Sequence, residues 1–507
     1  MSAIRKLAGQ TAIYGLSSIL GRLFNYLLVP LHTRVFLTGQ YGEVTKMYAY
    51  VSFLIVLFSY GMETAYFRFA QQEKDNPKVY STSLISLLAS SVGLAAIFIL
   101  FSGAIAGWIG DASMPLHPEY VSWFGCILAL DAISYIPFAR LRRENKATRF
   151  VSIKVVWIIS NVFFNVYFLL WCKHVVRMPG SIQDPVLHIS YPDLGVGYVF
   201  IANLIASSIT LLLLTPEIFR IKFDFDKELW RKMIVYALPL MIMGTAGMVN
   251  ETFDRILLPK LLTDKSTALA ELGIYGACYK LSIIMTLFVQ TFRYAAEPFF
   301  FEHSGKDNAK QTYANVMHYF IITCAVIFLG IMMYMDVVKY FIGKSYWGGL
   351  KIVPILLLAN LCLGVFFNLS IWYKLSGHTR WGAFLAVFGA VITLILLFWW
   401  IPLMGYMGAA WATLVCYASM MVLSYIIGQK YYPVDYNLSS FVKYIGVSVL
   451  FYFFSEFLRN HFEWTKGPML IINSFLMIAF LLLIFVTERD KIPYLYKPLN
   501  KGIRNKK

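Results

Sequence analysis

Glu251, Asp254 and Arg255 lie within one turn of a predicted helix, in an otherwise apolar stretch of the chain. Residues three or four apart lie on one face of a helix, so the two carboxylates and the guanidinium should share a stripe. Two carboxylates in a low-dielectric site resist ionising together, and such a pair could exchange a proton or hold Na⁺. A static ion pair between Glu251 and Arg255 is the alternative that the same spacing allows.

Basic residues are the second group that could do chemistry inside apolar stretches. They are Arg22, Lys46, Arg255, Lys280 and Arg293. A charge within a membrane-spanning helix is costly, so it normally faces a cavity or a partner. Lys and Arg make charge-assisted hydrogen bonds to phosphate, and Arg can engage two oxygens at once. These positions are therefore candidates for binding an anion, although Lys46 could instead extend to the membrane surface.

The elements that must position these residues are membrane-spanning helices. Hydrophobic residues make up 59% of the 507 residues and charged residues 14%, whereas soluble proteins have about 45–50% and about 25%. Because a spanning helix needs about 20 apolar residues, we predict an all-α polytopic membrane protein with fourteen such helices. The expected spans are 9–33, 44–67, 80–109, 119–138, 151–172, 195–215, 232–258, 272–300, 313–335, 350–373, 381–402, 405–428, 439–457 and 467–487.

The charge distribution predicts the orientation. Lys and Arg gather in the segments that share a side with the N-terminus, above all between Arg140 and Arg149. Basic loops stay in the cytoplasm, so we expect both termini there. This topology also accounts for the net charge of +17 without a nucleic-acid partner. The six cysteines form no CxxC pair, and no bound metal or organic cofactor is expected.

An internal repeat predicts two pseudo-symmetric lobes. Phe24 to Pro30 matches Phe253 to Pro259 at an offset of 229, and Gly42 matches Gly273 at an offset of 231. Six helices separate the copies, so the halves should be parallel and surround a central cavity, as in many transporters. The expected divisions are an N-terminal lobe at 1–220, a C-terminal lobe at 221–430, and two extra helices with a basic tail at 431–507.

Three helix-weakening residues lie in the span that carries the acidic pair: Pro239, Gly244 and Gly247. They could form a hinge for alternating access, although Gly and Pro are ordinary in membrane helices.

Several motifs resemble those of one family of transporters. They are Arg22 to Phe69 with its Gln40-Tyr41-Gly42, then Tyr236-x-x-Pro239, Phe253-Asp254-Arg255, Gly273-x-Tyr275, and Ile401 to Ala410. In this order they resemble the O-antigen and capsule oligosaccharide flippases (Wzx-type) of the multidrug/oligosaccharidyl-lipid/polysaccharide (MOP) superfamily. The resemblance implies movement of polyprenyl-diphosphate-linked oligosaccharide from the cytoplasmic to the outer leaflet of the bacterial cytoplasmic membrane. It implies no enzymatic activity.

The repeat and the resemblance together assign expected roles. Arg22, Asn25, Lys46, Arg255, Lys280 and Arg293 should contact the diphosphate and glycan, and Glu251 and Asp254 should bind the coupling H⁺ or Na⁺. The repeat places Arg22 opposite Glu251 and Asn25 opposite Asp254. Expected partners are membrane lipids and a polysaccharide polymerase or ligase, and the chain is expected to be a monomer. A cation-coupled multidrug exporter and a flippase for lipid II-type peptidoglycan precursors are the alternatives.

Overall fold

The computed structural model describes residues 26–73, 76–110, 115–172, 194–219, 224–305, 307–462 and 466–489. All regular structure in these ranges is helical. Eleven helices there are long and apolar enough to span a membrane, or twelve if the bent pair α12 (Ala268–Leu281) and α13 (Ile283–His303) is one span. The chain is therefore a multi-pass membrane protein, and the predicted all-α fold is confirmed.

The count of fourteen spans stays a prediction. Most of the expected span 9–33 lies outside the described residues, which are helical from 26 to 35. The expected span 195–215 corresponds to α9 (Gly197–Leu213), which is apolar but only 17 residues long.

The described residues form two compact units. One comprises the described residues up to Phe299 together with Ile342–Tyr431, and the other comprises Phe300–Phe341 and the described residues from Tyr432. The division into lobes at residue 220 stays a prediction.

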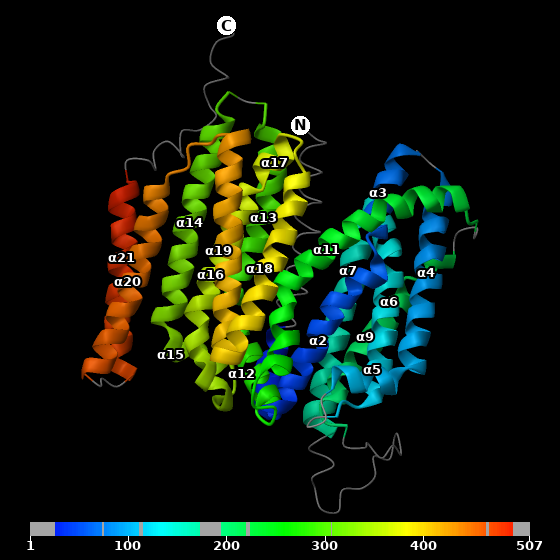
Figure 1. Ribbon diagram of the computed structural model, residues 1–507, viewed down its shortest axis with the longest axis horizontal. Helices are drawn as coiled ribbons and strands as arrows, with labels where there is room; N and C mark the ends of the chain where they lie inside the picture. Colours follow the sequence, from blue (N-terminus) through cyan, green and yellow to red (C-terminus); the bar gives the residue numbers. More distant parts are fainter. Residues whose placement is uncertain are drawn as a thin grey trace, which may run out of the picture. The chain divides into compact units, whose positions relative to one another are not determined.

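The first unit contains most of the helices (Figure 1). Besides α9, α12 and most of α13, they are α2 (Thr38–Ser59), α3 (Met62–Gln72), α4 (Pro77–Leu100), α5 (Ser102–Ile109), α6 (Pro118–Arg143), α7 (Ala147–Val166), η1 (Tyr167–Cys172), α10 (Thr215–Phe219), α11 (Lys227–Leu261), η3 (Lys344–Ile352), α16 (Val353–Leu369), α17 (Ile371–Leu375), α18 (Arg380–Met404) and α19 (Tyr406–Tyr431). Within this unit α4 packs on α6, α7 packs on α9, and α16 and α18 both pack on α19.

The second unit is smaller. It contains α14 (Ala309–Met333), α15 (Met335–Val338), η2 (Lys339–Phe341), α20 (Leu438–Phe462) and α21 (Lys466–Glu488). Buried residues such as Leu329, Tyr444 and Phe480 form its core. Asp336 of α15 accepts hydrogen bonds from Lys339 at 2.5 Å and from Arg459 at 2.8 Å, and the second of these connects α15 to α20.

The long helix α11 packs against both α2 and α18, and so connects these two helices within the first unit. It begins at Asp226, whose carboxylate accepts hydrogen bonds from the backbone N–H groups of Glu228 and Leu229. Pro239 lies inside the helix and removes one backbone hydrogen bond. Figure 1 shows α11 as one curved helix running between its neighbours.

The helices α2 and α12 cross at very short range. A Cβ atom added to Gly42 would lie 1.9 Å from the carbonyl oxygen of Leu269, so only glycine fits there. This crossing brings the C-terminal half of α12 next to α11 and to the helical residues 26–35, where the candidate site lies.

Candidate functional site

A cluster of cations and tyrosines lies where residues 26–35, α11 and α12 meet. The guanidinium carbon of Arg255 is 4.0 Å from the ring centroid of Tyr279, within the range of a cation–π contact. Tyr26 donates a hydrogen bond to the backbone carbonyl of Lys280 at 3.0 Å, and its ring centroid lies 5.8 Å from the Lys280 ammonium. Lys280 also interacts electrostatically with Arg255 and Glu251. Two cations from different helices, Arg255 and Lys280, therefore lie next to tyrosine rings.

The ion pair between Glu251 and Arg255, which was the alternative that their spacing allowed, does not form. Arg255 donates instead to the backbone carbonyl of Glu251, with an Nη1–O distance of 3.1 Å. This leaves the Glu251 side chain exposed. The static pair that the spacing allowed is thus replaced by a contact that does not engage the carboxylate.

Asp254 has a different environment from Glu251. Its side chain is buried, with 4% exposed, and accepts a hydrogen bond from the Tyr275 hydroxyl at 2.6 Å. The backbone N–H of Arg255 donates to its other oxygen at 2.8 Å. A buried carboxylate needs such donors, so Asp254 connects α11 to α12, whereas Glu251 is open.

A polar network fixes the turn of α11 just before Glu251. Asn250 donates from its side-chain amide to the carbonyl of Ala386 at 3.2 Å and accepts from the Thr393 hydroxyl at 3.2 Å. Its backbone carbonyl accepts from the Tyr417 hydroxyl at 3.2 Å. These contacts join α11 to α18 and α19 at the residue next to Glu251.

A histidine and two asparagines border the cluster on the side of α7. His32 is 7% exposed, and its Nε2 lies 2.9 Å from the Oδ1 of Asn165. The Asn165 amide in turn donates to the Oδ1 of Asn161 at 2.8 Å. His32 interacts electrostatically with Lys280. The buried side-chain amides of Asn161 and Asn165 thus hold the His32 imidazole near Lys280.

The predicted site residues therefore lie in several different environments. The structure brings Glu251, Arg255 and Lys280 together, with Asp254 beside them. Lys46 lies in α2 with only 5% exposed, so it does not extend to the surface, and it interacts electrostatically with Glu43. Arg22 and Asn25 lie outside the described residues.

Arg293 forms contacts away from this cluster. It lies 4.5 Å from the Phe367 ring centroid, and its Nε is 4.0 Å from a Glu297 oxygen. The other Glu297 oxygen accepts a hydrogen bond from Lys374 at 2.7 Å. The local pair with Glu297 follows the sequence spacing, but no described contact links Arg293 to Arg255 or Lys280.

The predicted hinge residues lie in the N-terminal and middle parts of α11. A Cβ at Gly244 would approach Val56 of α2 to 3.1 Å, so Gly244 permits close packing. Gly247 has open space around it, so packing does not require a glycine there. A hinge at Pro239, Gly244 and Gly247 stays a prediction.

Sequence reasoning missed the uncharged part of the site: Tyr26, His32, Asn161, Asn165, Asn250 and Tyr279. The signal was available, because each polar side chain lies in an apolar stretch where a buried polar group needs a partner.

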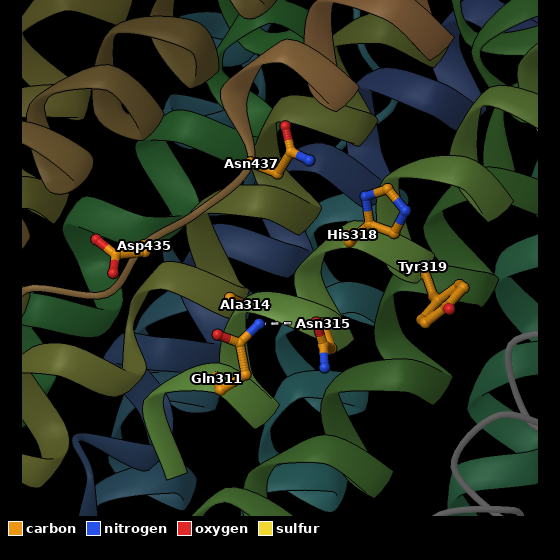
Figure 2. Close-up of a pocket in the computed structure, with 7 residues that line it drawn as sticks. All are labelled: Gln311, Ala314, Asn315, His318, Tyr319, Asp435 and Asn437. Atoms are coloured by element: carbon orange, nitrogen blue, oxygen red, sulfur yellow. Dashed lines mark hydrogen bonds between the residues drawn. The ribbon is translucent and has the colours of Figure 1, made fainter. Parts of the chain in front are cut away.

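A separate polar pocket lies in the second unit. Gln311, Asn315, His318 and Tyr319 of α14 line it together with Asp435 and Asn437, and its volume is about 330 Å³. Figure 2 shows these residues. Beneath it, His318 Nε2 is 3.0 Å from Glu488 Oε2, which suits an ion pair but not the angles of a hydrogen bond. None of the predicted transport residues lines this pocket.

Comparison with known proteins gives the chain a family and a fold. Residues 7–304, more than half of the chain, match the family described as "Polysaccharide biosynthesis protein". No curated protein matches the chain.

Solved structures with the same fold are transporters of the MOP superfamily. The lipid II flippase MurJ in an inward closed conformation has a TM-score of 0.67 at 14% identity, over 95% of this chain and 99% of that one. An inward-facing multidrug resistance MATE transporter has a TM-score of 0.64 at 12% identity, over 84% and 97%. An outward-facing MATE transporter has a TM-score of 0.58 at 13% identity, over 84% and 94%. The predicted MOP-type fold is confirmed.

Proposed function

Since the chain belongs to the polysaccharide biosynthesis protein family, we propose that it moves polyprenyl-diphosphate-linked oligosaccharide from the cytoplasmic to the outer leaflet. The family and the fold support the broader role of a flippase or transporter. The observation that favours this substrate is that Arg255 and Lys280 lie close together. Arg255 contacts the Tyr279 ring, and Lys280 lies beside Tyr26. The protein would act in the bacterial cytoplasmic membrane, with both termini in the cytoplasm.

The cations suit a diphosphate. A diphosphate must be held while its water is removed, and a guanidinium and an ammonium replace that water with charge-assisted hydrogen bonds. Arg255 belongs to α11 and Lys280 to α12, so one anion would bridge the two helices. Alternating access would then change the distance between the two cations and release the lipid on the other side.

Glu251 is the residue that we assign to cation coupling. It is exposed and lies next to Arg255, whereas Asp254 is occupied by Tyr275. An exposed carboxylate can take up H⁺ or Na⁺ when the anion leaves, which would link cation entry to substrate release. A cation entering down a potential of 100 mV contributes about 2.3 kcal/mol.

The lipid-linked oligosaccharide pool tests this function. After deletion of the gene, an impermeant glycan-modifying reagent applied to intact spheroplasts would measure finished polyprenyl-diphosphate oligosaccharide in each leaflet. We expect the lipid to accumulate on the protected inner side and the Arg255→Gln variant to reproduce this. Lys232→Gln is the matched control, because Lys232 is paired with Glu228 on the surface.

Two results would replace the proposal. An unchanged oligosaccharide pool with new sensitivity to cationic drugs would favour the multidrug exporter, whose fold is similar. Accumulation of the peptidoglycan precursor alone would favour a lipid II-type flippase, whose fold is also similar.

A further inference from the structure

An apolar groove lies on the surface of the first unit, between α4 and the beginning of α11. Its volume is about 440 Å³. Tyr60, Ser86, Ala89, Trp230, Ile234 and Leu238 are among the residues that line it. Ala89 and Leu238 are exposed, so the groove is open along one side.

The polar groups that line the groove form hydrogen bonds with one another. Ser86 Oγ lies 2.7 Å from the Tyr60 hydroxyl and accepts a hydrogen bond from the Trp230 indole N–H at 2.8 Å. Ser90 donates to the same Tyr60 hydroxyl at 3.4 Å. Because these groups satisfy one another, the open surface is hydrocarbon and aromatic and has no hydrogen bond to offer a polar ligand.

Two cations lie in the first turns of α11, the helix that contributes Trp230, Ile234 and Leu238 to the groove. Lys227 and Arg231 precede Ile234 and Leu238 by the three- and four-residue steps that keep side chains on one helix face. Both are exposed, and in the described part of the chain neither forms an ion pair. Lys232, on a different face, pairs with Glu228 at 2.8 Å.

We propose that this groove is a binding site for one anionic phospholipid of the cytoplasmic leaflet. The acyl chain lies against Ala89, Ile234 and Leu238, and the headgroup phosphate lies against Lys227 and Arg231. The charge distribution predicts that this end of α11 faces the cytoplasm, where anionic lipids meet basic residues. The site is separate from the cluster around Arg255, so it does not require that a glycan be transported.

Native mass spectrometry of the full chain tests the site. The protein is mixed with phosphatidylglycerol or with phosphatidylcholine of the same acyl chains, and the retained lipid is counted. We expect phosphatidylglycerol to be retained preferentially. Each cation near a membrane surface changes the affinity by roughly fivefold, so the double variant Lys227→Gln/Arg231→Gln should reduce the preference on the order of thirtyfold.

Two further variants separate the headgroup from the chain. Lys232→Gln removes the same charge from the other face and should leave the preference unchanged. Ala89→Trp fills an exposed position of the groove and should reduce retention of both lipids. Equal retention of the two lipids by the unmodified protein, or an equal loss in Lys232→Gln, would overturn the site. If the unmodified protein retained undecaprenyl phosphate in preference to phosphatidylglycerol, and Ala89→Trp lost that preference, the occupant would be a polyprenyl chain and the phospholipid assignment would be overturned.

Discussion

Gly42 and Gly273 face each other at the crossing of α2 and α12, and they are equivalent positions of the internal repeat. A Cβ on Gly42 would lie 1.9 Å from the carbonyl oxygen of Leu269, and a Cβ on Gly273 would lie 1.9 Å from that of Thr38. Thr38 and Leu269 are separated by the same 231 positions as the two glycines.

The contact is thus reciprocal, as at a two-fold axis: each glycine meets the backbone carbonyl four residues before the other glycine. The crossing lies near the ends of α2 and α12 that the charge distribution predicts to face outward. A backbone contact without side chains brings the repeated helices as close as they can approach.

Replacement of Gly42 by Ala should therefore weaken the crossing. The added methyl group meets backbone rather than a flexible side chain, so the helices must separate, at a cost of about 1–3 kcal/mol. We expect a lower midpoint of thermal unfolding for purified Gly42→Ala. Gly39→Ala on the same helix is the control, because nothing lies within 4 Å of its added Cβ. Equal midpoints for the two variants would contradict the close crossing.

Removal of the Tyr275 hydroxyl should destabilise the protein through Asp254. Tyr275→Phe leaves a buried carboxylate with one donor fewer, which costs about 1–3 kcal/mol. Chemical unfolding of Tyr275→Phe should show this loss, whereas Tyr294→Phe, at a position 44% exposed, should show little. A Tyr275→Phe variant as stable as the unmodified protein would mean that the hydrogen bond does not form.

Glu251 and Asp254 should respond differently to neutralisation. Glu251→Gln should keep its thermal stability and its substrate binding but lose the dependence of transport on the ion gradient, because its side chain is exposed and unpaired with Arg255. Asp254→Asn should lower the stability, because its buried oxygens accept two hydrogen bonds. Transport in proteoliposomes with imposed H⁺ or Na⁺ gradients measures the coupling. If Glu251→Gln unfolds instead, Glu251 has a structural role.

A lysine at position 255 should not replace the arginine without loss of substrate binding. A lysine keeps the charge but cannot stack a planar guanidinium on Tyr279 or engage two phosphate oxygens. We expect Arg255→Lys to weaken binding of a polyprenyl diphosphate by roughly tenfold, and Arg255→Gln to weaken it further, since a hydrogen bond to a charged group contributes about 1.5–3 kcal/mol. Isothermal titration of the purified protein in detergent measures both. Full affinity in Arg255→Gln would remove this residue from the binding set.

The spacing of apolar residues by itself determined that this is a helical, multi-pass membrane protein, because a bilayer imposes the length and composition of every span. The recurring residues also determined the repeat in which Gly42 and Gly273 are equivalent positions, whereas their contact is seen only in the structure. Two motifs that were recognised separately, Asp254 with Arg255 and Gly273 with Tyr275, turn out to meet in space.

Only the tertiary structure decided which partners the site residues have. Helical spacing shows that Glu251 and Arg255 share a face, but not that the guanidinium takes the backbone carbonyl and a tyrosine ring on α12. Nor does it show that Tyr26 bonds to Lys280, 254 positions away, or that His32 meets Asn165. The periodicity of a helix specifies the face of each residue. How each helix is rotated about its own axis, and which neighbour a given face contacts, depend on how all the helices pack together.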